Sequence, residues 1–392
     1  MLFLINGNQL KYRHMKTKHL LLLALLQSIF SINAQELALV RDNDLYGYIS
    51  NSGEYSIKPQ FEKASSFSGE YASVLQGEKW GLINTSGEWV LQPEYDKIKD
   101  FNSGYVLVLK NDQWNYVNAS GEILKTPVHE KYYDFNNGVA FYRSNKKYGL
   151  LGTDGKLVLE PTYDVIKPFK NGYARVRNGD NWGMINKKGD EFIPLEYAEL
   201  GNYNSKGVGA RKGDSFGVVL NNQFNIISGA DKIWDFTDDS DLTYARSQKK
   251  VGFVNNKGEW VIQPIYKKVR AFNNGLAPVI DNKLWGYINE KGEQVIDYIY
   301  RDAETFSASG LAPVKENKLW GFIDKTGKTV IPSEYVITAG GLSLFSKNSI
   351  KGFHNGLARV KKGKKWGFLD EEGNPLGGKW FQNVELFVNT AQ

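Results

Sequence analysis

Few groups of side chains in this sequence have the type and spacing that chemistry requires. The densest is the acidic stretch Asp235-Phe-Thr-Asp-Asp-Ser-Asp241, whose clustered oxygens could hold a calcium ion. It lacks the ordered spacing of a calcium-binding loop, so a solvated loop is the preferred interpretation. Asp96, Asp134 and Asp164 could in principle supply the paired carboxylates of glycoside hydrolysis. They recur from one segment to the next, however, and an active site needs one asymmetric constellation. We therefore interpret them as turn residues.

Histidine and cysteine chemistry is equally sparse. The sequence contains no cysteine, which excludes thiol catalysis and cysteine-ligated metal sites. After residue 34 only His129 and His354 remain, and neither has a second histidine at metal-ligand spacing. We expect His129 to be a packing residue and His354 to face solvent in a turn. The sequence thus predicts no catalytic residue, no cofactor and no metal.

A tandem repeat organises the chain and must position every candidate residue. An aromatic-Gly dipeptide recurs every 34 or 35 residues, with one spacing of 46. Two degenerate copies, Trp114-Asn115 and Val251-Gly252, complete a set of ten. The regular copies are Tyr46-Gly47, Trp80-Gly81, Tyr148-Gly149, Trp182-Gly183, Phe216-Gly217, Trp285-Gly286, Trp320-Gly321 and Trp366-Gly367.

Each unit reads as three or four short antiparallel strands. After the dipeptide, most copies carry Asn-x-x-Gly, as at Asn84 to Gly87, which is turn chemistry because glycine accepts a positive φ. A second apolar run follows, often closed by a proline such as Pro93, and later comes an alternating run such as residues 173–177. No helical period is evident outside the N-terminal apolar segment. The sequence therefore predicts an all-β fold.

This pattern resembles the WG-repeat (KWG-repeat) family of bacterial proteins. Lys79-Trp80-Gly81 and Lys365-Trp366-Gly367 carry the signature, and the resemblance extends from Leu37 to about Phe387. It implies repeats used as a binding or structural surface, without a set of catalytic residues. The local departures from the pattern are Asn115 for glycine, Gln223 at a turn glycine and Val251 for the aromatic.

The sequence leaves the arrangement of the ten units open. They could form an open or spiral β-array, or a closed propeller-like ring. Ten blades exceed the usual four to eight, and no strand is visibly left over to close a ring, so we prefer the open array. The long spacing predicts a projecting insertion near residues 336–350.

The N-terminal 34 residues resemble a secretory signal. A basic segment, Met15 to His19, precedes a short apolar run and the small residue Ala34. The run is too short to span a bilayer, and translation could begin at Met15. We expect cleavage, an exported mature chain of residues 35–392 and no membrane span. Without the four basic residues of the signal, 45 basic and 43 acidic residues leave a net charge of +2, which disfavours nucleic acid as a partner.

The aromatic residues are the remaining candidates for contacts. The motif tryptophans recur beside a glycine that permits close approach, so we expect each to pack against the neighbouring unit. Three aromatics lie outside the repeat positions and are the candidate ligand or partner contacts, Trp234, Phe345 and Trp380. We expect a non-enzymatic extracytoplasmic scaffold that binds an unknown protein or envelope polymer. The alternative is a glycan-binding or cell-wall-binding module with weak hydrolase activity.

Overall fold

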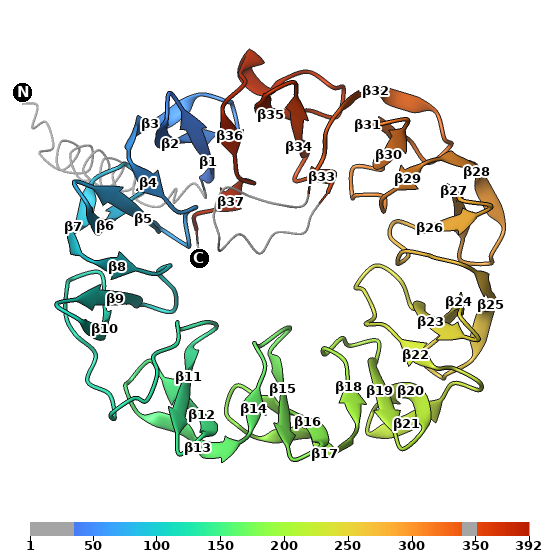
Figure 1. Ribbon diagram of the computed structural model, residues 1–392, viewed down its shortest axis with the longest axis horizontal. Coiled ribbons are helices and arrows are strands. Elements are labelled where there is room, and N and C mark those ends of the chain that lie inside the picture. The colour runs from blue at the N-terminus through green and yellow to red at the C-terminus, as the bar shows by residue number, and fades with distance from the viewer. Residues whose placement is uncertain (1–34, 339–350, 392) are drawn as a thin grey trace, which may run out of the picture.

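The chain folds into ten small antiparallel sheets that follow one another around a closed ring (Figure 1). The computed structural model describes residues 35–338 and 351–391. Each sheet is one repeat unit, and its strands step from the inside of the ring to the rim (Figure 1). The protein is therefore a ten-bladed β-propeller.

The strands of the blades are short. Blades one to five contain β1 (Glu36–Asp42), β2 (Leu45–Ser50) and β3 (Tyr55–Phe61); β4 (Lys63–Ala64), β5 (Tyr71–Gln76), β6 (Lys79–Asn84) and β7 (Trp89–Tyr95); β8 (Lys97–Ile98), β9 (Val106–Lys110) and β10 (Gln113–Val117); β11 (Val139–Ser144), β12 (Lys147–Gly152) and β13 (Leu157–Tyr163); β14 (Val165–Ile166), β15 (Tyr173–Asn178), β16 (Asn181–Asn186) and β17 (Glu191–Tyr197).

Blades six to ten continue the series. They contain β18 (Glu199–Leu200), β19 (Val208–Lys212), β20 (Ser215–Leu220) and β21 (Gln223–Ile226); β22 (Lys232–Ile233), β23 (Thr243–Ser247), β24 (Lys250–Val254) and β25 (Trp260–Tyr266); β26 (Leu276–Asp281), β27 (Leu284–Asn289) and β28 (Gln294–Tyr300); β29 (Asp302–Ala303), β30 (Ala312–Glu316), β31 (Leu319–Ile323) and β32 (Thr329–Tyr335); β33 (Phe353–His354), β34 (Leu357–Lys362) and β35 (Lys365–Leu369).

The motif glycine is required by a bulge in the outermost strand. In blade five, Trp182 lies opposite Tyr197 and Met184 opposite Ile193, with a register shift between the two pairs. A Cβ on Gly183 would lie 2.7 Å from the carbonyl oxygen of Ile193. A real Cβ cannot approach a backbone oxygen so closely, so only glycine permits this bulge. The element that approaches the glycine is thus the outermost strand of the same blade.

Two of the local departures from the repeat pattern, Asn115 and Gln223, have visible structural consequences. In blade three, Asn115 carries a side chain where the outermost strand would bulge inward, and that sheet has three strands, with a single bridge from Val117 to Ile123 beyond them. In blade six, the outer turn is a two-residue hairpin in which Asn221 and Asn222 have φ angles of 50° and 60°. Asparagine tolerates this left-handed conformation, which explains why a turn glycine is not needed at Gln223.

The ring is closed by the C-terminal end of the chain. β36 (Asn383–Val384) and β37 (Val388–Asn389), which follow a short 3₁₀ turn η1 (Leu376–Gly378), both pair antiparallel with β1. The all-β tandem array is confirmed, and of its two arrangements the structure has the ring. Our preference for an open array was wrong because the last residues of the chain complete the first blade.

The hydrophobic core lies mainly between consecutive blades. The cluster around buried Trp285 joins Tyr300 of the same blade to Ala312 and Val314 of the next, and the cluster around Trp320 joins blades nine and ten in the same way. The expected packing of motif tryptophans at the junctions between units is therefore confirmed at these two blades.

Two sequence features fall wholly or largely outside the described part of the chain. These are the signal segment 1–34 and most of the insertion near 336–350. Among the described residues, no helix is long and apolar enough to cross a membrane.

Candidate functional site

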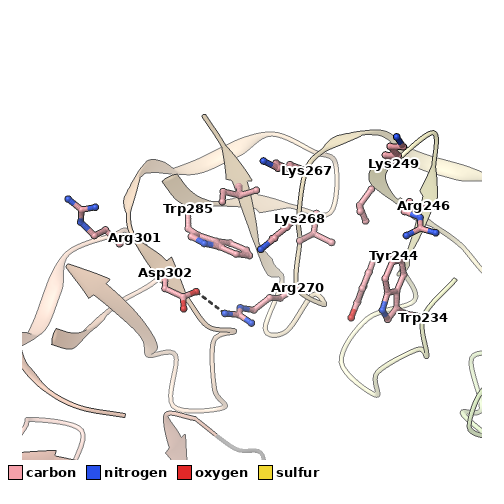
Figure 2. Close-up of a pocket in the computed structure, with 13 residues that line it drawn as sticks. Trp234, Tyr244, Arg246, Lys249, Lys267, Lys268, Arg270, Trp285, Arg301 and Asp302 are labelled. Carbon is pink, nitrogen blue, oxygen red and sulfur yellow. Dashed lines mark hydrogen bonds and ion pairs between the residues drawn. The ribbon is translucent and has the colours of Figure 1, made fainter. Parts of the chain in front are cut away.

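The site that departs most clearly from the repeat is a groove where blades seven and eight meet, with a volume of ≈ 700 Å³. Trp234, Tyr244 and Lys249 come from blade seven, whereas Arg270 and Trp285 come from blade eight (Figure 2). The other lining residues are Arg246, Val251, Lys267, Lys268, Val269, Ile280, Arg301 and Asp302, the last two at the start of blade nine. We call this feature the blade 7–8 groove.

At this groove the aromatic residues occupy different repeat positions from those in other blades. In blade five, the motif residue Trp182 lies beneath Lys167 and Arg175. In blade seven the motif residue is Val251, and the two positions around it hold Trp234 and Tyr244. These two rings stack with centroids 4.8 Å apart and an interplanar angle of 27°. In blade seven the aromatic rings are therefore at the two positions beside the motif residue, and Trp234 and Tyr244 form one wall of the groove.

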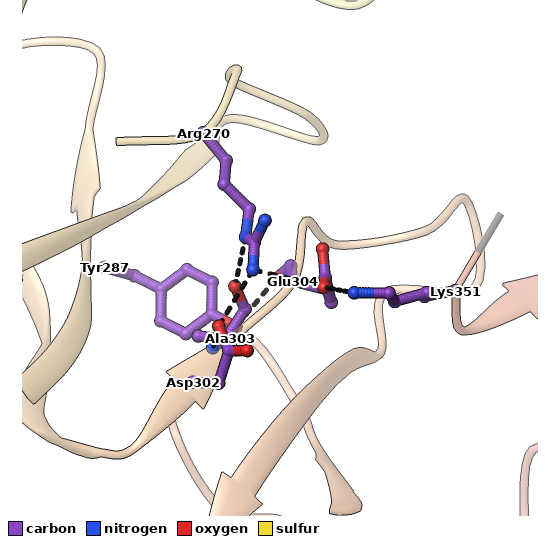
Figure 3. Close-up of polar contacts among 6 residues, drawn as sticks. All are labelled: Arg270, Tyr287, Asp302, Ala303, Glu304 and Lys351. Atoms are coloured by element: carbon purple, nitrogen blue, oxygen red, sulfur yellow. Dashed lines mark hydrogen bonds and ion pairs between the residues drawn. The ribbon is translucent and has the colours of Figure 1, made fainter. Parts of the chain in front are cut away.

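The second wall is built on Trp285 and Arg270. Trp285 is buried, and the Arg270 guanidinium lies 5.0 Å from its ring centroid. Arg270 also donates from Nη2 to Asp302 Oδ1 at 2.8 Å and from Nε to the carbonyl oxygen of Ala303 at 2.6 Å (Figure 3). This wall is therefore fixed by contacts with blade nine.

The Arg270 contacts extend into a chain of ion pairs across three blades. Arg270 lies 3.1 Å from Glu304 Oε1, and Lys351 Nζ of blade ten lies 2.6 Å from the same oxygen (Figure 3). Tyr287 OH donates to the Glu304 carbonyl oxygen at 2.8 Å, and burial raises the pKa of this tyrosine well above its usual value. Charge-assisted hydrogen bonds of this kind hold the groove wall in one position.

Positive charge exceeds negative charge in the groove. Arg246 is paired with Asp231 at 2.5 Å, and Arg270 is paired as described above. The remaining bases are exposed, and none forms an ion pair with a described residue; they are Lys249, Lys267, Lys268 and Arg301. These four side chains give the groove a net positive charge that is available to a ligand.

The three predicted contact residues have different environments. Trp234 lines the blade 7–8 groove. Trp380 is half-buried and stacks on Tyr335 at 6.5 Å, and its ring also covers Gly367 at the rim of blade ten. Phe345 lies outside the described residues.

The side chains of the acidic stretch 235–241 form hydrogen bonds and an ion pair with blade six, which precedes it. Asn202 donates to both oxygens of Asp235, at 3.0 Å from its backbone nitrogen and 2.6 Å from its side chain. Asn204 Nδ2 donates to Asp238 Oδ1 at 2.8 Å, and Lys206 pairs with Asp241 at 3.2 Å. In residues 35–338 and 351–391, no group of three acidic, histidine or cysteine residues could hold a metal ion.

The two histidines lie in separate places. His129 stacks on Tyr132 with centroids 4.3 Å apart and lies within 2.9 Å of Thr126 Oγ1, and burial lowers its pKa. His354 is exposed at the turn between β33 and β34, as expected. The other ring nitrogen of His129, Nδ1, has no hydrogen-bond partner among the described residues, so no carboxylate orients this ring as a nucleophile, base and acid arrangement requires.

Sequence reasoning missed the basic residues of the groove. Lys267 and Arg301 directly follow the last aromatic of their outer strands, a position that is acidic in five other units. Aligning that position across the repeats would have revealed the change of charge. Attention to aromatic residues alone found Trp234 but none of the bases beside it.

Comparison with known proteins identifies the repeat. The model of the WG containing repeat matches the chain at residues 46–80, 80–114, 116–148, 148–182, 182–211, 252–285, 285–320, 320–336 and 348–366. The chain belongs to the WG-containing repeat family. The matches leave out residues 212–251, the part of this WG-repeat protein that contains Trp234, Tyr244 and Val251. A comparison with curated proteins found no match.

Solved structures share the architecture of this WG-repeat protein at low sequence identity. The crystal structure of the eukaryotic initiation factor is 11% identical, with a TM-score of 0.51 over 91% of this chain and 99% of that chain. Dihydro-heme d1 dehydrogenase NirN is 10% identical, with a TM-score of 0.41 over 92% and 76%. PorZ of Porphyromonas gingivalis is 9% identical, with a TM-score of 0.24 over 87% and 58%. At such identities the first likeness shows the fold alone, and the other two carry no argument.

Proposed function

We propose that this protein is a non-enzymatic interaction scaffold that is exported and binds a protein partner at the cell envelope through the blade 7–8 groove. The single observation that carries the proposal is the groove itself, because it is where the repeat residues Val251, Lys267 and Arg301 differ from their counterparts. Repeat arrays provide extended binding surfaces, and specificity on them comes from residues that differ between units. The basic and apolar N-terminal segment supports export.

The contacts of the acidic side chains support a binding role in place of catalysis. The recurring acids, such as Asp96 and Asp164, are occupied with hairpin amides and lysines, as an architectural role requires. The acidic stretch around Asp238 holds the neighbouring blade. A scaffold function uses this rigidity because a preorganised surface loses little entropy when a partner binds.

A pull-down with a matched pair of variants tests this function. The full mature chain is immobilised, exposed to envelope extract, and compared with Lys249→Glu/Lys268→Glu and with Lys188→Glu/Lys257→Glu. The control lysines are exposed or at turn tips on the opposite ends of the strands and change the net charge equally. We expect one protein to be retained by the wild type and the control and lost from the groove variant. No groove-dependent partner, with all baits folded, would contradict the proposal, as would fractionation that finds the chain in the cytoplasm.

A glycan-binding module remains the competing function, and the aromatic geometry disfavours it. Sugar rings stack on free aromatic faces, but one face of Trp234 is covered by Tyr244, and Lys232 Nζ lies 4.6 Å from its ring centroid. Binding on a polysaccharide array that is weakened by Trp234→Ala or Trp380→Ala would favour the glycan function. We expect no such binding.

A further inference from the structure

One repeat position carries a charged residue at most junctions between blades. In most units it directly follows the aromatic that ends the outer strand, and its backbone N–H donates to a carbonyl oxygen at the hairpin of the following blade. In five units this position is acidic: Glu62, Asp96, Glu130, Asp164 and Asp231.

The carboxylate at this position pairs with a lysine and accepts a hydrogen bond from a backbone N–H of a hairpin. Asp164 pairs with Lys147 of the preceding blade at 2.8 Å and accepts a hydrogen bond from the Gly179 backbone N–H at 2.8 Å. Asp96 pairs in the same way with Lys79 and accepts from the Asn111 N–H at 3.2 Å. The ordinary unit therefore presents little uncompensated charge at the junction.

At the blade 7–8 groove the residue at this position is positively charged and not negatively charged. Lys267 takes the place of the acid at the start of blade eight, and Arg301 takes it at the start of blade nine. Lys250 corresponds to Lys79 and Lys147, so the usual lysine–aspartate pair becomes two lysines. Like charges at one junction are destabilising, and two consecutive reversals that line the same groove indicate selection for an anionic ligand.

The replacement of the motif aromatic by valine leaves room in the groove beside these charged side chains. Val251 is smaller than the tryptophan or tyrosine found in most blades, and it lines the groove together with Lys249 and Lys267. A groove of ≈ 700 Å³ matches the size of ordinary ligand sites and admits several residues of an extended chain.

We propose that the blade 7–8 groove binds an acidic segment of a protein partner, a run of aspartate and glutamate side chains that pair with Lys249, Lys267, Lys268 and Arg301. This inference rests on the proposed scaffold function and specifies the chemistry of its partner. Exposed lysines on flexible stems act as point charges and suit carboxylates whose positions vary along a peptide.

The aromatic residues favour a peptide over the other polyanions. Single-stranded nucleic acids bind by stacking bases on free aromatic faces, and sugars use such faces in the same way. Trp234 is stacked on Tyr244 and lies under Lys232, while Trp285 is buried under Arg270. The groove therefore offers exposed positive charge without an open stacking platform.

Fluorescence anisotropy with a defined probe tests the inference. The probe is a short fluorescein-labelled peptide of alternating aspartate and glutamate, and the reference peptide has asparagine and glutamine at the same positions. We expect the full mature chain to bind only the acidic peptide, more weakly as salt rises. The variant Lys267→Asp/Arg301→Asp, which restores the charge of the repeat, should bind at least about tenfold more weakly. Lys188→Glu/Lys257→Glu should bind as the wild type does.

Several outcomes would overturn the inference. Equal binding of both peptides, equal binding by the restored-charge variant, or tighter groove-dependent binding of oligogalacturonate or oligothymidylate would each reject an acidic peptide as the ligand. The pull-down separates this failure from failure of the scaffold function. A partner lost from the groove variant alongside an acidic peptide that does not bind rejects only the charge-based inference, whereas the absence of any groove-dependent partner rejects the function.

Discussion

Val40 of β1 lies directly opposite Val384 of β36, so the first strand of this propeller shares one sheet with a strand near the C-terminal end of the chain. Both side chains are fully buried in one apolar cluster with Phe368 and Phe387. The Glu385 backbone N–H also donates to the Leu39 carbonyl oxygen at 2.8 Å. Closure of the ring therefore depends on the same pairing and packing that hold any blade together, supplied by the two ends of the chain.

Disrupting this pairing should open the ring. In Val384→Asp a carboxylate would be buried among apolar side chains, and the free energy of unfolding should fall by about 3 kcal/mol or more. Chemical denaturation measures the loss. The control is Val330→Asp, since Val330 is 38% exposed on β32, and its cost should stay within about 0.5 kcal/mol. Equal losses in the two variants would show that the terminal strand does not stabilise the ring.

The bulge at the motif glycine makes a second prediction. In Gly183→Ala, a Cβ would lie 2.7 Å from the Ile193 carbonyl oxygen, so the outer strand must shift and the protein should lose roughly 2–3 kcal/mol. Gly179→Asn is the matched control in the same blade, because Gly179 has open space around it and a φ of 57° that asparagine tolerates. Thermal unfolding of both variants decides the matter, and a control that is as unstable as Gly183→Ala would contradict the steric explanation.

Local chemistry was predictable from the sequence because every unit repeats it. The Asn84 to Gly87 turn illustrates this, since Asn84 Oδ1 accepts from the Glu88 N–H at 2.9 Å and Gly87 has a φ of 82°. Such a turn needs only residues that are neighbours in sequence, and ten copies in register make the signal strong. The strands on either side follow from the same alternation.

Closure and the groove could not be predicted in the same way. The pairing of Val40 with Val384 joins residues from opposite ends of the chain, and nothing in a two-residue strand distinguishes it from a loop. The groove depends on Lys249, Lys267 and Arg301 being brought together from three blades. Their juxtaposition is a property of the ring curvature, which the sequence pattern does not encode.

The acid at the junction position predicts a dependence of stability on pH. The Lys147 ammonium and the Gly179 N–H lower the pKa of Asp164 in the folded state. A carboxyl with a lowered folded pKa stabilises the protein above its unfolded pKa, about 3.9, and this contribution is lost as pH falls through the folded value. Asp164→Asn should therefore have a lower Tm than the wild type at neutral pH, and the difference should shrink below about pH 4. A Tm difference that stays constant over this range would contradict the assignment.

Restoring the repeat residue at position 267 should have opposite effects on stability and on binding. In Lys267→Asp the new carboxylate should pair with Lys250 as Asp96 pairs with Lys79, so an ion pair would replace two lysines at equivalent positions. We expect the free energy of unfolding to rise by roughly 0.5 kcal/mol, the usual size of a surface pair. Denaturation at low salt should show the gain, and added salt should reduce it because the pair is exposed.

A double-mutant cycle isolates the pair responsible for this gain. Lys250→Ala in the Lys267→Asp background should abolish the stabilisation, whereas Lys268→Ala should leave it in place. The same Lys267→Asp variant should bind the acidic peptide more weakly than the wild type. Stability that rises while binding falls would mean that the lysine at this junction is retained for its ligand and at a cost to the fold. A variant that loses stability would instead show that Lys267 supports the blade junction, and the charge reversal would then need a structural explanation.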